Sequence, residues 1–247
     1  MARPELDPFA PLYHQIKTHL IEEIRAGHLR PGDRVSSERE LSERFGVSRM
    51  TARQALVQLE LEGRVVRVQG KGSFVAFPKI EQPLMSITGF TEDMRRRGLE
   101  PATRVLSAAE VPAEGRVATA LRCREGTPIY RLERLRLADG EPLALEVSHL
   151  LAESCPGLLS LDLEGRSLYE LLRTRYGRRL LRATQTLEAV PAEGPLAEAL
   201  HVRTGTPLMY MERLVHDQND QPVELVLSHY RGDRYRFIAE LRAQEGE

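Results

Sequence analysis

The sequence predicts a two-domain α+β protein: a small helical domain that ends in a β-hairpin, then a larger α/β domain with a mainly antiparallel sheet. Three observations predict this architecture. Apolar residues at helical spacing and a glycine-rich hairpin occupy residues 1–77. A short segment bounded by prolines follows at 78–83. Beyond it, a pattern of roughly 40 residues occurs twice, which indicates an internal duplication.

Length and composition place the chain among globular proteins of the cell interior. Its 247 residues suffice for two domains of ordinary size. The two cysteines, Cys123 and Cys155, lie far apart, which argues against a disulfide framework or a zinc site. The first eight residues lack the apolar core of a signal peptide, and no apolar run reaches the ~18 residues of a membrane helix. We therefore expect a cytoplasmic protein without a metal or cofactor.

Three helices are expected in the first domain. Apolar residues between 12 and 24 have helical spacing. Ser37 and Glu40 have the spacing of a capping box, which predicts that a second, short helix starts there. Ser48 is a typical N-cap residue and predicts a third helix that runs to about residue 62.

The third helix is expected to present arginines to solvent. Its apolar residues follow a helical repeat and must face a core: Ala52, Ala55, Leu56 and Leu59. The same geometry places Arg49 and Arg53 on the opposite side, in the first turns. A short helix, a tight turn and a helix that carries Arg near its N-terminus are typical of a helix-turn-helix whose second helix enters a major groove.

A basic hairpin follows this helix. Residues 65–68 and 73–75 read as two strands around Gln69-Gly70-Lys71-Gly72, with Lys71 at the tip. Between residues 48 and 77 there are five basic and two acidic residues, although the whole chain has a net charge of −1. The alternative is a helical bundle whose charges are only solvated. The order of the elements favours a winged helix-turn-helix that binds DNA.

The second domain contains the duplication. Val111-Pro112-Ala113-Glu114-Gly115 recurs 79 positions later as Val190-Pro191-Ala192-Glu193-Gly194, and Gly126-Thr127-Pro128 recurs as Gly205-Thr206-Pro207. Each copy reads as a short amphipathic helix followed by two strands. Two copies are too few for a solenoid, so we expect their strands to join one sheet under approximate two-fold symmetry.

Two arginines share one face of the first repeated strand. Arg134 and Arg136 are two residues apart, so their side chains point the same way and repel each other unless an anion or carboxylates lie between them. In the second copy Arg213 matches Arg134, but Val215 matches Arg136. The pattern therefore predicts a single anion site. The alternative is that the two arginines are solvated or paired with Glu146.

The first domain resembles the GntR family of bacterial regulators. The segments that carry the resemblance are Arg34-Val35-Ser36-Ser37-Glu38-Arg39-Glu40-Leu41, Phe45-Gly46-Val47-Ser48-Arg49-Met50-Thr51-Ala52-Arg53-Gln54-Ala55-Leu56 and Gln69-Gly70-Lys71-Gly72-Ser73-Phe74-Val75. One departure is Ser36, where the family usually has proline. The resemblance implies that the DNA contacts are Arg39, Ser48, Arg49, Thr51, Arg53 and Gly70, to which Lys71 at the hairpin tip is added. Arg49 and Arg53 suit guanine, and the hydroxyls suit phosphates.

From about residue 84 to 241 the chain resembles the effector-binding domain of the HutC subfamily, of UTRA type, whose fold is similar to chorismate lyase. The resemblance is strongest to regulators of N-acetylglucosamine utilisation, through Gly89-Phe90-Thr91-Glu92-Asp93-Met94, Glu133 to Pro142 and Tyr230 to Tyr235. It implies a sugar-phosphate site. Gly89, Phe90, Thr91, Arg134 and Arg136 would hold the phosphate, and Glu146, Ser167, Tyr169, Glu224 and Tyr230 would hydrogen-bond the sugar. Gly89 departs from the small hydroxyl residue often found there.

The combined expectation is a transcription regulator that acts as a homodimer on a palindromic operator of double-stranded DNA. We expect a repressor that glucosamine-6-phosphate or N-acetylglucosamine-6-phosphate releases or resets. Alternatives are a regulator that senses another small anion, a constitutive architectural DNA binder, and an enzyme of chorismate lyase-like fold. Histidines are present, but no nucleophile motif or metal pair accompanies them, so an enzyme is not expected.

The expected domains are 1–77 and 84–241, with a linker at 78–83 and a tail at 242–247.

Overall fold

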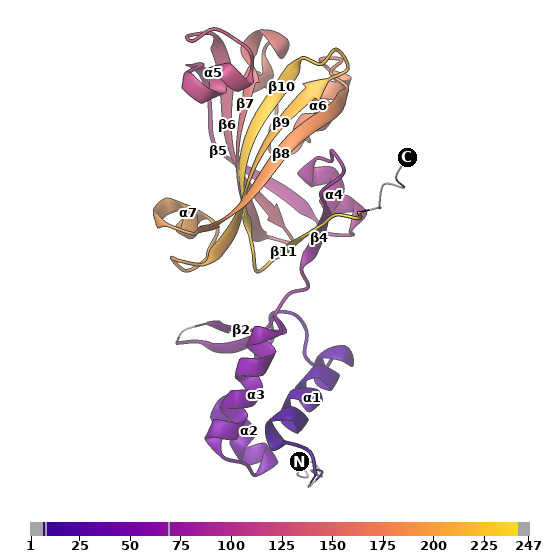
Figure 1. Ribbon diagram of the computed structural model, residues 1–247, viewed down its shortest axis with the longest axis vertical. Coiled ribbons are helices and arrows are strands. Elements are labelled where there is room, and N and C mark those ends of the chain that lie inside the picture. Colours follow the sequence, from indigo (N-terminus) through magenta and orange to yellow (C-terminus); the bar gives the residue numbers. More distant parts are fainter. Residues whose placement is uncertain (1–6, 8, 69, 242–247) are drawn as a thin grey trace, which may run out of the picture. The chain divides into compact units, whose positions relative to one another are not determined.

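The computed structural model describes residues 7, 9–68 and 70–241 and divides the chain into two compact units, Met1–Lys79 and Ile80–Glu247 (Figure 1). The expected tail at 242–247 and Gln69 in the hairpin lie outside the described residues. Each unit combines helices with antiparallel strands, as the sequence predicts.

The first unit is a winged helix-turn-helix. Its helices are α1 (Leu12–Arg25), α2 (Glu38–Phe45) and α3 (Arg49–Leu61), and its strands are β1 (Arg34–Val35), β2 (Val65–Val68) and β3 (Gly72–Val75), in the sheet order β1-β3-β2. Ser37 and Glu40 form the predicted capping box at the start of α2. Ser48 caps α3 by accepting a hydrogen bond from the amide of Thr51 at 3.1 Å. β1 was not predicted.

One apolar core holds the three helices and the sheet of this unit together. Ile16 and Leu20 from α1 are fully buried and pack in one cluster with Leu41 from α2 and Leu59 from α3. The turn between α2 and α3 depends on Gly46, whose φ of 69° lies in the left-handed region that glycine adopts without strain. The turn and the shared core fix the angle at which α3 leaves α2.

The second unit is built on one six-stranded antiparallel sheet, in the order β5-β6-β7-β10-β9-β8. The first copy of the duplication is β5 (Pro101–Pro112), α5 (Gly115–Ala120), β6 (Pro128–Ala138) and β7 (Glu141–Leu151). The second copy is β8 (Leu180–Pro191), α7 (Gly194–Ala199), β9 (Pro207–Asp217) and β10 (Pro222–Arg231). The two copies meet at β7 and β10, so the strand order is symmetric about that pair, as expected. Each copy also contains a long leading strand that the sequence did not indicate.

In the described part of the second unit, two α-helices lie outside the duplication, α4 (Phe90–Arg96) and α6 (Leu168–Thr174) (Figure 1). Two 3₁₀ turns, Ala152–Ser154 and Leu158–Ser160, precede α6. α6 packs on Tyr130 and Leu132 of β6, and Met94 of α4 packs on Ala138 and Leu143. Two apolar clusters therefore lie on either side of the part of β6 that carries the paired arginines.

The sequence suggests a linker at residues 78–83. In the structure, residues 80–83 form strand β4 (Ile80–Pro83). This strand pairs in parallel with β11 (Tyr235–Ile238). Ile80 is buried in a cluster with Met94 and Tyr235, and its amide donates to the carbonyl of Arg234 at 2.7 Å. The segment therefore belongs to the second unit, because its partner strand comes from the far end of the chain, which a local pattern does not reveal.

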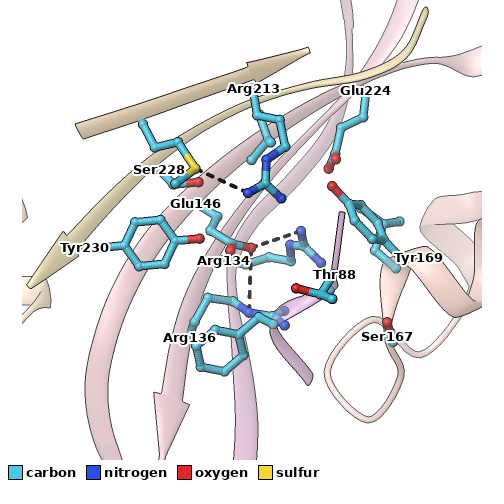
Figure 2. Close-up of a pocket in the computed structure, with 15 residues that line it drawn as sticks. Thr88, Arg134, Arg136, Glu146, Ser167, Tyr169, Arg213, Glu224, Ser228 and Tyr230 are labelled. Atoms are coloured by element: carbon cyan, nitrogen blue, oxygen red, sulfur yellow. Dashed lines mark hydrogen bonds and ion pairs between the residues drawn. The ribbon is translucent and has the colours of Figure 1, made fainter. Parts of the chain in front are cut away.

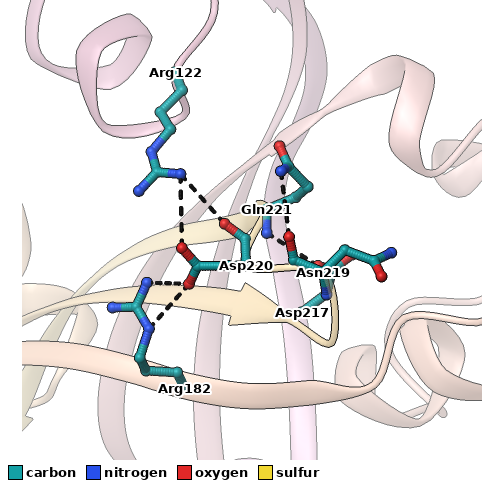
Figure 3. Close-up of polar contacts among 6 residues, drawn as sticks. All are labelled: Arg122, Arg182, Asp217, Asn219, Asp220 and Gln221. Carbon is teal, nitrogen blue, oxygen red and sulfur yellow. Dashed lines mark hydrogen bonds and ion pairs between the residues drawn. The ribbon is translucent and has the colours of Figure 1, made fainter.

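Acidic side chains fix the turn between β9 and β10 (Figure 3). The carboxylate of Asp217 accepts from the amides two and four residues later, at 2.8 and 3.1 Å, and from Arg178 at 2.7 Å. Asp220 accepts from Arg182 on β8, and its carbonyl accepts from Arg122, which follows α5, at 3.3 Å. These contacts tie the hairpin to both copies of the duplication, and so fix the position of β9 in the sheet.

The core of the first unit gives a stability prediction. Leu59→Ala is expected to lower the free energy of unfolding of this unit by about 2–5 kcal/mol, because Leu59 is fully buried and leaves a cavity. Urea unfolding followed by circular dichroism measures the change. Leu61→Ala is the control on the same helix: Leu61 is 75% exposed, and its loss is expected to change stability by less than about 0.5 kcal/mol. Equal effects of the two substitutions would contradict the packing described for α3.

Candidate functional site

A polar pocket opens on the sheet face that carries Arg134 and Arg136 (Figure 2). Its lining residues come from the segment before α4, from α6 and from the four central strands: Thr88, Gly89, Phe90, Arg134, Arg136, Glu146, Ser167, Leu168, Tyr169, Met211, Arg213, Glu224, Val226, Ser228 and Tyr230. The cavity measures about 40 Å³. Roughly 10–15 Å³ of such space is enough to hold one water molecule, so the pocket is narrow.

A wider cavity of about 590 Å³ adjoins this pocket and shares Gly89, Ser167 and Tyr169 with it. Several of its other lining residues are basic: Arg95, Arg96, Arg173 and Arg178. Because it is the roomier of the two, the wider cavity offers space for the part of a ligand that the inner pocket does not hold.

One carboxylate lies between the two arginines of β6. Arg134 Nη2 donates to Glu146 Oε2 at 3.3 Å and to Ser148 Oγ at 3.1 Å, and Arg136 Nε lies 3.6 Å from the same Glu146 oxygen. Both arginines are at most 4% exposed. The pairing with Glu146 that the sequence left open is therefore present. It does not satisfy both guanidiniums, since Arg134 Nε and Arg136 Nε and Nη1 have no hydrogen-bond partner.

Arg136 also contacts the start of α4. Its Nη2 donates to Thr91 Oγ1 at 3.1 Å, and its guanidinium carbon lies 4.6 Å from the centre of the Phe90 ring, a cation–π contact. The pKa of Arg136 is lowered to about 10, chiefly because the side chain is buried; Glu146 opposes this shift and the nearby Arg134 contributes to it. Arg136 therefore stays charged at neutral pH, but in a setting that favours an additional anion.

A third guanidinium, which the sequence analysis did not assign to the site, completes the pocket. Arg213 on β9 is buried, and its Nε donates to Gln185 Oε1 at 3.0 Å. Figure 2 shows its guanidinium directed toward the same space as Arg134, with Tyr169 and Glu224 beside it. The signal for this residue was present in the sequence, because Arg213 is the repeat counterpart of Arg134.

The charges of the pocket do not balance. Three guanidiniums face two carboxylates, and burial raises the pKa of one of these carboxylates, Glu224. One oxygen of Glu224 also lacks a hydrogen-bond partner. Because unpaired buried charge is costly, an anion that binds the free guanidinium N–H groups would be stabilised here.

The structure brings the residues of the implied sugar-phosphate site together. Nine of the ten line the inner pocket: Gly89, Phe90, Arg134, Arg136, Glu146, Ser167, Tyr169, Glu224 and Tyr230. The tenth, Thr91, lines the wider cavity and reaches the inner one through its hydrogen bond with Arg136. Ser167, one of the expected residues, caps α6. The pocket is also lined by Thr88, Met211 and Ser228, which the sequence analysis missed because they carry no distinctive local pattern.

The residues implied in DNA contact lie on the surface of the first unit. Arg39, Arg49, Arg53, Gly70 and Lys71 are exposed, and Ser48 and Thr51 share a hydrogen bond of 2.8 Å at the start of α3. The buried side of α3 carries the predicted apolar residues, Ala52, Ala55, Leu56 and Leu59. The arginines therefore point away from the core of their own unit.

Comparison with known families gives two matches. Residues 12–75 match the bacterial regulatory proteins of the gntR family, and residues 96–236 match the UTRA domain. The chain is 38% identical to the HTH-type transcriptional repressor NagR of Bacillus subtilis, over 92% of this chain and 93% of NagR. It is 30% identical to the probable fructoselysine utilization operon transcriptional repressor of Escherichia coli K12, over 87% of this chain and 88% of that protein.

Solved structures agree with this likeness. The crystal structure of PhnF from Mycobacterium smegmatis is similar with a TM-score of 0.67 at 34% identity, and the match covers 93% of this chain and 100% of PhnF. The PhnF effector domain alone has a TM-score of 0.63 at 32% identity, over 66% of this chain. These relatives are transcriptional regulators and not enzymes, and no helix in the described part of this chain could span a membrane.

The shared carboxylate of the pocket gives a second prediction. Glu146→Gln is expected to destabilise the second unit by about 3–5 kcal/mol, because two buried guanidiniums lose their common counter-ion. Inorganic phosphate should raise the melting temperature of this variant more than that of the parent protein. Glu133→Gln is the control, since Glu133 pairs with Arg131 near the surface and its loss is expected to cost less than about 1 kcal/mol. A variant Glu146→Gln as stable as the parent would show that the pocket needs no anion.

Proposed function

The chain belongs to the GntR family of bacterial regulatory proteins and carries a UTRA domain, and from this premise we propose that it is a cytoplasmic repressor controlled by a phosphorylated amino sugar. The observation that carries the proposal is the set of three buried guanidiniums around one small cavity. A phosphate dianion supplies the acceptors that the free N–H groups of Arg134 and Arg136 lack.

The rest of the pocket suits a sugar. Glu146, Ser167, Tyr169, Glu224 and Tyr230 provide carboxylates and hydroxyls that can accept from, or donate to, sugar hydroxyl groups. The resemblance to regulators of N-acetylglucosamine utilisation supports glucosamine-6-phosphate and N-acetylglucosamine-6-phosphate as the first compounds to test. The name of the Escherichia coli relative also points to sugar utilisation.

We propose that the protein binds a palindromic operator as a homodimer, since one winged helix contacts only a few base pairs. Arg49 and Arg53 would read guanine in the major groove, Ser48 and Thr51 would contact phosphates, and Arg39, Gly70 and Lys71 would complete the contact surface. The assignment is supported by the exposure of six of these residues: Arg39, Ser48, Arg49, Arg53, Gly70 and Lys71.

A route from the pocket to the boundary of the unit supports effector control. An anion that engages Arg136 competes with its contacts to Thr91 and Phe90 at the start of α4. Met94 of α4 packs in one cluster with Ile80, the first residue of the second unit. Movement of α4 would therefore reach the segment that joins the two units. A coupling of ~1–3 kcal/mol would change operator affinity about 5–150-fold.

Calorimetric titration tests the effector. Glucosamine-6-phosphate or N-acetylglucosamine-6-phosphate is expected to bind, and unphosphorylated N-acetylglucosamine to bind roughly 100-fold or more weakly, because charge-assisted hydrogen bonds to phosphate are lost. Arg134→Ala should keep DNA binding but make it insensitive to the sugar phosphate. Binding of an organic acid in place of both sugar phosphates would favour the alternative ligand class, and normal release of Arg134→Ala from DNA would refute the anion site.

The DNA contacts are tested separately. Arg49→Ala and Arg53→Ala should each cost about 1–3 kcal/mol of discrimination between the operator and a scrambled duplex, because a bidentate contact with guanine is lost. Fluorescence anisotropy on an operator selected from a random duplex pool measures the loss. Calorimetry with the sugar phosphate is the control and should give the parent affinity. Unchanged discrimination in both variants would overturn their role as base-reading residues.

A further inference from the structure

A second basic cavity lies in the first unit, where the sheet meets α2 and α3. It measures about 280 Å³, and four arginines line it: Arg34, Arg39, Arg49 and Arg67. Glu38 is the one carboxylate among its lining residues in the described part of the chain. Arg34 and Arg67 belong to none of the contact sets assigned above, so the cavity extends beyond the proposed DNA contacts.

The arginines of this cavity differ in their partners. Arg67 Nη2 donates to Glu38 Oε1 at 2.7 Å, and Arg39 pairs with Glu43 at 3.4 Å on the exposed side of α2. Arg34 and Arg49 form no ion pair with the described residues. Glu40 is already bound in the capping box with Ser37, whose hydrogen bonds are the main cause of its lowered pKa. The cavity therefore carries a clear excess of positive charge.

The strands bring two of these arginines to the cavity from opposite sides of β3. Arg34 is on β1 and Arg67 on β2, and both strands pair with β3. Arg34 passes directly over Gly72, where an added Cβ would come within 3.3 Å of Arg34 Nε. The absence of a side chain at Gly72 thus leaves room for the guanidinium. Glu38 holds one nitrogen of Arg67 and leaves its other N–H groups available.

We propose that this cavity seats one phosphate of the DNA backbone, bound by Arg34 and Arg67, with Glu38 as the residue that positions Arg67. A phosphate matches the fork of N–H donors that two guanidiniums present. Arg49, in the first turn of α3, lines the same cavity, so a duplex that presents a base to Arg49 brings its backbone to the opening. The inference rests on the proposed entry of α3 into the major groove. The phosphate contact would fix the register of the first unit on the duplex without reading sequence.

The test is the salt dependence of binding by the full-length double variant Arg34→Gln/Arg67→Gln. Fluorescence anisotropy between 50 and 200 mM KCl, on the selected operator and on a scrambled duplex of equal length, gives the slope of log affinity against log salt. We expect the slope to fall in magnitude by about one, because one phosphate is no longer neutralised. Affinity for both duplexes should fall by a similar, several-fold factor, and their ratio should not change. Arg25→Gln, at the exposed end of α1 and outside the cavity, is the matched control and should leave the slope unchanged.

A further variant separates positioning from charge. Glu38→Gln makes the cavity more positive but releases Arg67, so a simple charged patch would bind DNA more tightly, whereas the proposed seat binds it more weakly. Thermal unfolding establishes that the variants are folded. An unchanged slope in the double variant, a loss confined to the operator, or tighter binding by Glu38→Gln would each overturn the inference. If the double variant keeps its slope and Arg49→Ala loses discrimination, only the phosphate contact in this cavity is overturned. If binding is unaffected in all variants, the proposed DNA contacts are overturned as well.

Discussion

The second unit depends on one carboxylate that serves two buried guanidiniums. Burying a charge is costly unless it is paired, and Glu146 can pair with Arg134 and Arg136 only in part. Two apolar clusters lie beside the arginines, and the pocket that the arginines line is small, about 40 Å³. The fold is therefore stable enough to keep these charges buried and yet leaves them short of acceptors. This deficit of acceptors around Arg134 and Arg136 is the physical basis of the proposed anion site.

The duplication places equivalent residues of the two copies around this pocket, and the differences between the copies decide which charges line it. The antiparallel order places β6 and β9 symmetrically about the central pair, so Arg134 and its counterpart Arg213 face the same space. Arg136 faces it from the first copy only, because the second copy has Val215 at that position. Across the central pair Glu146 lies opposite Ser228. A symmetric scaffold thus holds an asymmetric set of charges, with more cations on one side, which gives a ligand a defined orientation.

The sequence predicts best where local chemistry decides the structure. The capping box of Ser37 and Glu40 correctly predicted the start of α2. The alternation of residues around Arg134 correctly predicted a strand that carries Arg134 and Arg136 on one face. β1 has two residues, too few for any periodic pattern. β5 is exposed on both faces from Leu106 to Glu110, so no alternation marks it as a strand. The pairing of β4 with β11 joins segments about 155 residues apart. Most of the implied ligand residues line the pocket. Arg213 was missed because the duplication was used only to predict the fold, and not to find side chains equivalent to Arg134.

Arginine side chains occur in two electrostatic settings in this protein: exposed on the first unit and buried in the second. Arg49 and Arg53 are exposed, so dissolved ions screen them, and contact with DNA releases counter-ions from the duplex. Arg134, Arg136 and Arg213 are buried, where dissolved salt screens charge far less. Ionic strength therefore acts mainly on how tightly the first unit holds DNA, while a charged group inside the buried pocket interacts with the few charges around it almost unscreened. Dissolved salt is therefore expected to weaken the contact of the first unit with DNA more than the charge–charge contacts inside the pocket.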